Sequence, residues 1–175
     1  MINPESKRIL IVDDDPGILK YLSRSLDRGG YTVEIAETGL AALESFNQTP
    51  PSLILLDIRI PGIDGYEFCK IIRSSPAGES VPIIFISGLQ EENDKLKSFA
   101  CGGVDYLTKP FNLKEVRARI KLHLSLQEKI DELALFNRAM LDREGKIIEL
   151  KEEVNALCRE SGKKIRYPEI WKEEE

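Results

Sequence analysis

Aspartates at two separate places are the residues of this chain most able to do chemistry. The run Asp13–Asp15 directly follows a short apolar stretch, and Asp57 directly follows another. Carboxylates that lie close together cannot all stay ionised without a counter-charge, and Mg²⁺ prefers oxygen ligands. The sequence therefore predicts a magnesium site, provided that the two apolar stretches lie side by side.

Two further polar residues supply what a phosphoryl group needs. Ser87 and Lys109 also come at the ends of short apolar runs. A carboxylate such as Asp57 can attack phosphorus and form an aspartyl phosphate. The phosphoryl oxygens then need a metal, an ammonium and a hydroxyl around them. Lys109 would supply the ammonium and Ser87 the hydroxyl, while the sequence leaves open whether Pro110 follows a cis bond.

The elements that must position these residues alternate regularly through the first 125 residues. Apolar runs with β-branched residues indicate strands, and stretches with helical spacing separate them. This alternation predicts an α/β fold: a doubly wound, five-stranded parallel sheet with helices on both faces. In the flavodoxin-like order 2-1-3-4-5, strands one and three are neighbours, so their terminal carboxylates would meet where open sheets bind ligands. The expected strands are 7–12, 31–36, 53–56, 82–86 and 104–107, and the expected helices are 17–28, 39–47, 66–73, 91–100 and one from 113.

Four stretches between residues 9 and 111 resemble the receiver domain of two-component response regulators, in the family's order. The resemblance implies that Asp57 is the phosphoacceptor and that Asp13 and Asp14 form the Mg²⁺ site, with Asp14 favoured as a direct ligand. The backbone carbonyl of Arg59 would complete the metal's protein ligands. The matching stretches are ILIVDDDP (9–16), LILLDIRIPGIDGYEF (53–68), PIIFISG (82–88) and VDYLTKPF (104–111).

The same resemblance implies roles for the other polar and aromatic residues. Ser87 and Lys109 would bind the phosphoryl oxygens. Tyr106 matches the aromatic residue that turns inward as the hydroxyl residue moves toward the phosphate. His123, the single histidine, lacks the sequence setting of a kinase acceptor and is expected on a helix surface or interface.

Residues 126–175 show no strand pattern and are expected to form a separate helical tail after a 1–125 receiver domain. Gly145 weakens a helix by about 1 kcal/mol relative to alanine. A coiled coil, a helical hairpin near 142–146 and a helix folded back on the receiver therefore stay open. Residues 136–160 are similar to the helical connectors that follow sensor modules. Residues 166–175 are expected to be poorly ordered unless Tyr167 and Trp171 dock on another part of the protein. One apolar column repeats every seven residues: Leu126, Leu133, Met140, Ile147 and Val154. The column just after it adds Ala134, Leu141 and Ile148, whereas the column four residues after it is mostly polar.

Composition excludes several classes of protein. The chain has 175 residues, 42% of them hydrophobic, with a net charge of −5. This charge argues against a nucleic-acid partner, and no apolar run is long enough for a membrane span or signal peptide. We therefore expect a cytoplasmic protein. The three cysteines are odd in number and form no CxxC pair, so free thiols are expected.

These observations together predict a phosphoacceptor signalling domain that assists only its own phosphorylation and dephosphorylation. Its partner would be a sensor histidine kinase or phosphotransfer protein, and a homodimer could form through the C-terminal helix. One alternative is a scaffold that ignores phosphate, and another is a fragment of a larger hybrid regulator. A haloacid-dehalogenase-like phosphatase is a poorer alternative, because it would need a second aspartate where Arg59 stands.

Overall fold

Five parallel strands form the sheet that carries the predicted site. The computed structural model describes residues 7–88 and 92–167. The strands run in the order β2-β1-β3-β4-β5, which confirms the predicted topology. Val12 pairs with Leu56, so the residues that end β1 and β3 reach the same edge of the sheet. The strands are β1 (Arg8–Val12), β2 (Thr32–Ala36), β3 (Leu53–Asp57), β4 (Ile83–Ser87) and β5 (Asp105–Thr108).

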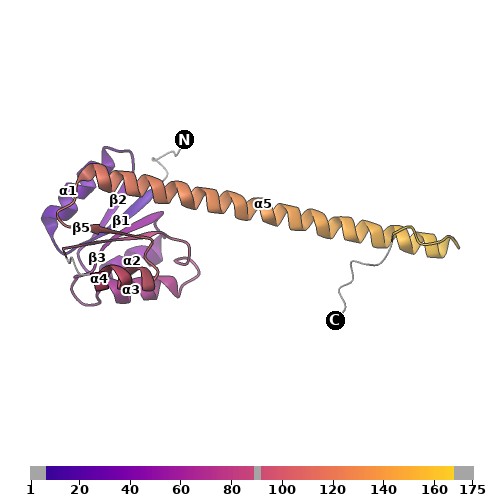
Figure 1. The fold of residues 1–175 in the computed structure, drawn as a ribbon, viewed down its shortest axis with the longest axis horizontal. Coiled ribbons are helices and arrows are strands. Elements are labelled where there is room, and N and C mark those ends of the chain that lie inside the picture. The colour runs from indigo at the N-terminus through magenta and orange to yellow at the C-terminus, as the bar shows by residue number, and fades with distance from the viewer. Residues whose placement is uncertain (1–6, 89–91, 168–175) are drawn as a thin grey trace. The chain divides into compact units, whose positions relative to one another are not determined.

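Helices cover both faces of this sheet, as expected for right-handed crossovers (Figure 1). Alternate residues of each strand enter one of two cores. Ile9 and Ile11 pack with buried residues of α1 and the start of α5, whereas Leu10 and Val12 pack with buried residues of α2 and α3. The helices are α1 (Pro16–Asp27), α2 (Gly39–Gln48), α3 (Gly65–Arg73), α4 (Glu92–Ala100) and α5 (Leu113–Glu160).

The chain divides into two units, residues 1–127 and 128–175, and α5 contributes to both. The helix continues through Gly145 without a break, so the alternative of a hairpin near 142–146 is wrong. A glycine costs only about 1 kcal/mol in a helix, and the charged residues around Gly145 are good helix formers. No neighbouring atom within 4 Å crowds Gly145 on the helix surface.

The second unit ends in a turn that sends the chain back along its own helix. Gly162 adopts a positive φ of 69°, and the N–H of Lys163 donates to the carbonyl of Cys158 at 2.8 Å. The N–H of Gly162 donates to the carbonyl of Arg159, which completes the Schellman pattern of a helix C-terminus. The residues that follow this turn can therefore reach the preceding turns of α5.

Asn155 holds this returning segment. Its side-chain oxygen accepts from the N–H groups of Arg166 and Tyr167, each at 3.0 Å, and its Nδ2 donates to the carbonyl of Tyr167 at 2.8 Å. The Lys151 ammonium lies 5.9 Å from the centre of the Tyr167 ring. Tyr167 therefore docks on α5, which is one of the two contacts on which order in residues 166–175 is expected to depend, and Trp171 lies outside the described residues.

Within residues 7–88 and 92–167, no helix combines the length and the apolar character that crossing a membrane would require.

Candidate functional site

The ammonium of Lys109 joins two carboxylates that are far apart in the sequence. Its Nζ donates to Oδ2 of Asp13 at 2.7 Å and to Oδ2 of Asp57 at 2.5 Å. Asp13 directly follows β1, Asp57 ends β3, and Lys109 directly follows β5. The sheet order therefore brings these three residues together, as the sequence predicted.

The second oxygen of each carboxylate is held by the backbone. Oδ1 of Asp13 accepts from the N–H of Asp15 at 2.9 Å, and Oδ1 of Asp57 accepts from the N–H of Arg59 at 3.1 Å. Asp13 is only 2% exposed and Asp57 only 6%. Both carboxylates are therefore fixed in position before any ligand arrives.

The three neighbouring aspartates at the end of β1 have different surroundings. Asp13 is buried, whereas Asp14 is exposed. Asp15 is the N-cap of α1, because its Oδ1 accepts from the N–H of Gly17 at 2.7 Å. Helix capping therefore accounts for Asp15 and leaves Asp13 and Asp14 facing Asp57.

These carboxylates fit a divalent cation. One oxygen each from Asp13, Asp14 and Asp57 lies within 4.8 Å of the other two. The donors are all hard carboxylate oxygens, which suit Mg²⁺. Three carboxylates carry three negative charges and Lys109 returns one positive charge, so the cluster has an excess that a dication would neutralise.

The pKa values at this site follow from burial and from the shared ammonium. Burial raises the pKa of Asp13, the charge of Asp57 acts in the same direction, and Lys109 only partly offsets them. Burial would lower the pKa of Lys109, but its hydrogen bonds to both carboxylates and their charges raise it overall. Lys109 therefore stays protonated at neutral pH, as an anion-binding group must.

Ser87 lies on the opposite side of Asp57 from Asp13, because β4 and β1 flank β3. It ends β4 and is 1% exposed. A small cavity of about 190 Å³ is lined by Asp57, Arg59, Ser87 and Gly88. Among the described residues, no atom lies within 4 Å of a Cβ added on Gly88, so the backbone is open at this position. The cavity is therefore next to the group predicted to accept phosphate.

Tyr106 and Pro110 flank Lys109 along the chain. Tyr106 is 7% exposed and belongs to the core that contains Phe85. Its side chain therefore occupies an inward position in this structure. The Lys109–Pro110 peptide bond is cis, which answers the question that the sequence left open.

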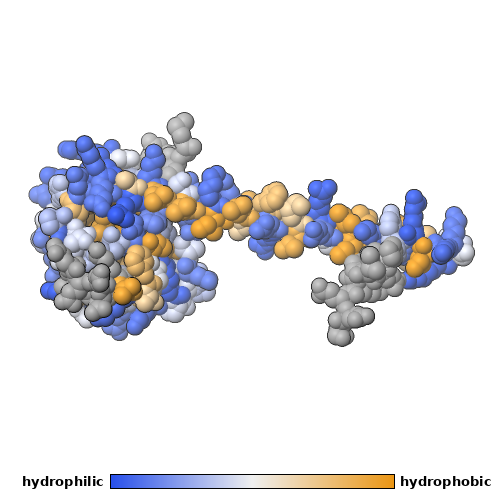
Figure 2. Space-filling view, in the orientation of Figure 1, coloured by the Kyte–Doolittle hydropathy of each residue, from blue (hydrophilic) through white to orange (hydrophobic). Residues whose placement is uncertain are grey.

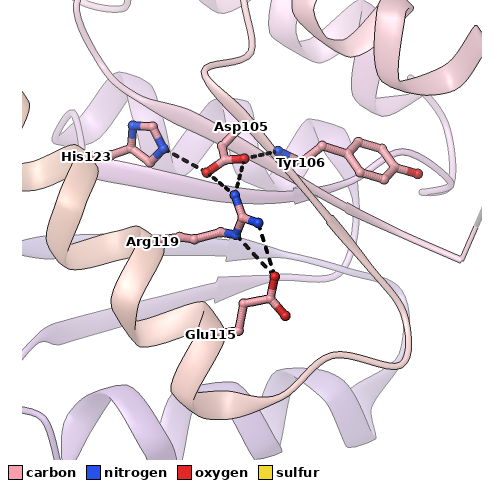
Figure 3. Close-up of polar contacts among 5 residues, drawn as sticks. All are labelled: Asp105, Tyr106, Glu115, Arg119 and His123. Atoms are coloured by element: carbon pink, nitrogen blue, oxygen red, sulfur yellow. Dashed lines mark hydrogen bonds and ion pairs between the residues drawn. The ribbon is translucent and has the colours of Figure 1, made fainter. Parts of the chain in front are cut away.

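The sequence prediction missed a polar cluster between β5 and α5 (Figure 3). Nη1 of Arg119 donates to both oxygens of Asp105, at 2.6 and 2.7 Å, and Nε2 of His123 lies 2.9 Å from Oδ2 of Asp105. Arg119 also contacts Glu115, one turn earlier in α5. The four-residue spacing of Glu115, Arg119 and His123 was the available signal. His123 thus ties the helix to the sheet.

An apolar stripe runs along α5 and includes more residues than the predicted column. Figure 2 shows hydrophobic side chains recurring along this helix between charged ones. Leu133, Met140 and Ile147 of the predicted column are 62, 41 and 42% exposed. The column three residues later adds Phe136 and Leu150, which are 61 and 54% exposed. Together these columns have the spacing of a coiled-coil seam.

Comparison with known proteins agrees with this geometry. Residues 9–121 match the family model described as the response regulator receiver domain. Over 127 residues the chain is 36% identical to the DNA-binding dual master transcriptional regulator RpaA of Synechocystis. The matched region covers 73% of this chain and 53% of that protein. Over 123 residues it is 40% identical to the alkaline phosphatase synthesis transcriptional regulatory protein PhoP of Bacillus subtilis, covering 70% and 50% respectively.

Solved structures show the same fold. The response regulator receiver domain protein (CheY-like) from Methanospirillum hungatei superposes with a TM-score of 0.67 at 33% identity, covering 70% of this chain and 97% of that one. The chain spans about half the length of the curated relatives it matches. The buried aspartate pair bridged by a lysine, the sheet order and these matches together show that the chain belongs to the response regulator receiver family.

Proposed function

We propose that this chain accepts a phosphoryl group on Asp57 from the phosphohistidine of a sensor kinase or phosphotransfer protein. The observation that carries the proposal is the position of Lys109, whose ammonium contacts both Asp57 and Asp13. A carboxylate oxygen of Asp57 would attack phosphorus while the phosphorus–nitrogen bond to the donor histidine breaks. The product is an acyl phosphate on Asp57.

The chain's own residues would bind the transferred group. Lys109 would donate to one phosphoryl oxygen and the Ser87 hydroxyl to another, because positioned donors stabilise the charge spread over these oxygens. Asp13, Asp14 and Asp57 would hold Mg²⁺, with the backbone carbonyl of Arg59 as the remaining protein ligand. When bound, the metal would neutralise negative charge on the phosphoryl oxygens.

The readout would begin at Ser87 and Tyr106. Movement of Ser87 toward the phosphoryl group would change the space beside Tyr106, which lies on the adjacent strand β5. The surface formed by α4, β5 and the start of α5 would change with it. A phosphoryl group can shift this equilibrium only as far as it binds one conformation better than the other.

The direct test is phosphorylation by a small-molecule donor. Incubation with acetyl phosphate and Mg²⁺ should add one phosphoryl group to the intact chain, measured by mass spectrometry. Asp57→Asn should abolish this addition, because the amide is a poor nucleophile, whereas the matched surface variant Asp27→Asn should retain it. Addition that persists in Asp57→Asn would contradict the assignment.

Two further measurements separate the rival functions. Steady turnover of p-nitrophenyl phosphate would support a haloacid-dehalogenase-like phosphatase instead. A scaffold that ignores phosphate would show no phosphorylation and no response to beryllium fluoride, a phosphoryl mimic. The proposal requires phosphorylation by acetyl phosphate and no steady turnover of p-nitrophenyl phosphate.

The tail would transmit the change by pairing with the same helix of a second chain. The exposed apolar side chains Leu133, Phe136, Met140, Ile147 and Leu150 support this part of the proposal. A single exposed helix gains little from such a stripe, but two paired helices would bury it. Phosphorylation would then alter self-association or the docking of a partner.

A further inference from the structure

Two thiols meet where α3 packs against the residue that follows α4. Cys69 lies in α3 and is fully buried, and Cys101 directly follows α4 and is 9% exposed. Sγ of Cys69 donates to the carbonyl oxygen of Cys101 at 3.0 Å, and Sγ of Cys101 donates to the carbonyl oxygen of Ser98 at 3.1 Å. The two thiol groups also lie close enough to shift each other's pKa. The phosphoacceptor site uses neither of them.

The contact between the two side chains makes the thiols chemically unequal. The Cys69 thiol lowers the pKa of Cys101 to about 7, with help from the N–H of Gly103 and the charge of Lys70, although burial opposes this. The Cys101 side chain and burial raise the pKa of Cys69, and the charge of Arg73 only partly offsets them. Cys101 is therefore the thiol of the pair that loses its proton more readily.

Only one of the two thiols borders an opening to solvent. A groove of about 820 Å³ between α3 and α4 is lined by Cys101, whereas Cys69 is not part of its wall. Among the described residues, the charged ones that line the groove are Asp64, Glu67 and Lys70 from the α3 side and Lys97 from α4. A small neutral oxidant can thus reach Cys101, and the thiol that would resolve the first oxidation product lies behind it. Reactive cysteines combine these features: a lowered pKa, access and a neighbouring second cysteine.

The backbone around the pair is already held in place. Nε and Nη2 of Arg73 in α3 donate to the carbonyl of Gly102, at 3.0 and 2.8 Å. An added Cβ on Gly103 would lie 2.7 Å from the ring of Phe85, so the turn packs tightly against β4. A covalent link from Cys69 to Cys101 would reinforce a contact that the folded chain already makes.

We propose that Cys101 and Cys69 form a peroxide-sensitive thiol pair that closes to a disulfide between α3 and the turn leading into β5. In the first step the sulfur of Cys101 attacks one oxygen of hydrogen peroxide, the oxygen–oxygen bond breaks, and the departing hydroxide takes a proton to become water. Cys101 is then a sulfenic acid. In the second step the sulfur of Cys69 attacks that of Cys101, the sulfur–oxygen bond breaks, and hydroxide leaves with the proton of Cys69 as water. Two thiols are oxidised, one peroxide is reduced, and two waters form.

The first test uses the unmodified full chain. After treatment with hydrogen peroxide, peptide mass spectrometry should find a Cys69–Cys101 disulfide that dithiothreitol reverses. Before oxidation, iodoacetamide at pH 7 should label Cys101 about tenfold faster than Cys158, which serves as an internal reference, and Cys69 more slowly than either. Labelling of Cys101 no faster than that of Cys158, or oxidation that joins Cys158 instead, would overturn the proposal.

Three variants separate the two steps. Cys69→Ser keeps a hydroxyl donor for Cys101, so oxidation should stay fast but stop at a sulfenic acid that dimedone traps. Cys69→Ala removes the donor, so iodoacetamide labelling of Cys101 should slow and require higher pH. Cys158→Ser should form the disulfide like the parent chain. Equal labelling rates in Cys69→Ser and Cys69→Ala, each checked for a native circular dichroism spectrum, would show that Cys69 does not activate Cys101.

Discussion

Lys109 and the carboxylates around it show how single residues set the chemistry of this chain. Asp13 and Asp57 each have one oxygen on the ammonium of Lys109 and the other on a backbone N–H, so the contacts of the folded chain fix both carboxylates. Burial makes the charged state of Asp13 unfavourable, and the ammonium of Lys109 offsets this only in part. The residues thus hold binding groups ready at the expense of local stability.

This cost predicts that Asp13→Asn stabilises the metal-free protein. Because the folded state raises the pKa of Asp13, its contribution to stability is present below the unfolded pKa of about 3.9 and is lost as pH rises through the folded value. At pH 7 with a chelator, Asp13→Asn should therefore unfold at higher urea concentration than the parent chain. The gap should narrow as the pH falls toward about 4.

The same prediction can be tested by adding magnesium. Added Mg²⁺ should stabilise the parent chain more than Asp13→Asn, because the variant has lost one candidate metal ligand. The exposed tail variant Asp142→Asn should follow the parent chain under all conditions. A lower urea midpoint for Asp13→Asn at pH 7 would mean that the contact with Lys109 outweighs the effect of burial.

Polar side-chain contacts connect elements of the structure, for example at Asp105 and Asn155. Asp105 connects β5 to α5 through Arg119 and His123, and Asn155 connects the end of α5 to the returning chain. Both contacts join residues of different elements, so they decide which parts of the fold move together. Each can be tested by removing one partner.

Arg119→Met should weaken the connection between β5 and α5. Burial would raise the pKa of Asp105, but its hydrogen bonds to Arg119 and His123 lower it overall. Such a carboxylate contributes stability above its unfolded pKa, and the contribution is lost as pH falls through the folded value. The variant should lose about 1 kcal/mol of unfolding free energy at pH 7.

Urea unfolding at several pH values measures this loss. The difference between parent and Arg119→Met should shrink as Asp105 becomes protonated in acid. Lys121→Met, an exposed substitution in the same helix, should change stability by less than Arg119→Met at every pH. A loss that does not depend on pH would assign the effect to packing of the arginine stem instead.

Asn155→Ala should release the returning segment while leaving α5 intact. The side chain satisfies two N–H groups and one carbonyl of that segment, and each hydrogen bond contributes about 1 kcal/mol. Hydrogen exchange at the amides of Arg166 and Tyr167 should therefore speed up by about tenfold or more. Asn137→Ala, an exposed substitution in the same helix, is the matched control and should leave these two amides unchanged.

The whole molecule joins a receiver domain to a helix with an exposed apolar stripe. Such a stripe on an otherwise charged helix favours pairing with a second helix. Sedimentation in Mg²⁺ should give a dimeric mass, either constantly or only after beryllium fluoride is added. A change on adding the mimic would mean that the pocket controls self-association, and an unchanged dimer would mean that another protein reads the switch.

One substitution pair tests whether the stripe forms the interface. Leu133→Glu places a charge in the stripe and should convert the dimer to a monomer. Leu135→Glu places the same charge two residues away, on a different face of the helix, and should leave the mass unchanged. Leu135 is 71% exposed and Leu133 is 62% exposed, so the two differ mainly in the face of the helix on which they lie. A monomeric parent chain, with and without the mimic, would be contrary to helix pairing.

The sequence alone determined the sheet order and the residues at its edge. Strand-forming runs that end in Asp13, Asp57, Ser87 and Lys109 leave few arrangements, because right-handed crossovers and a buried parallel sheet restrict the topology. The start of α1 is equally local, because Asp15 caps the helix directly before Pro16. These features depend on periodicity and on residues adjacent in the chain.

Only the tertiary structure decided the features that depend on distant contacts or on a balance of small energies. Cys69 and Cys101 meet because α3 packs against the turn after α4, and no spacing between them signals this. Asn155 looks like any polar helix residue until the chain reverses at Gly162 and presents its backbone. Helix α5 passes through Gly145 because the propensities of its neighbours outweigh the cost of one glycine. Local pattern therefore specified the acidic site at the edge of the sheet, whereas packing specified the thiol pair and the end of the tail.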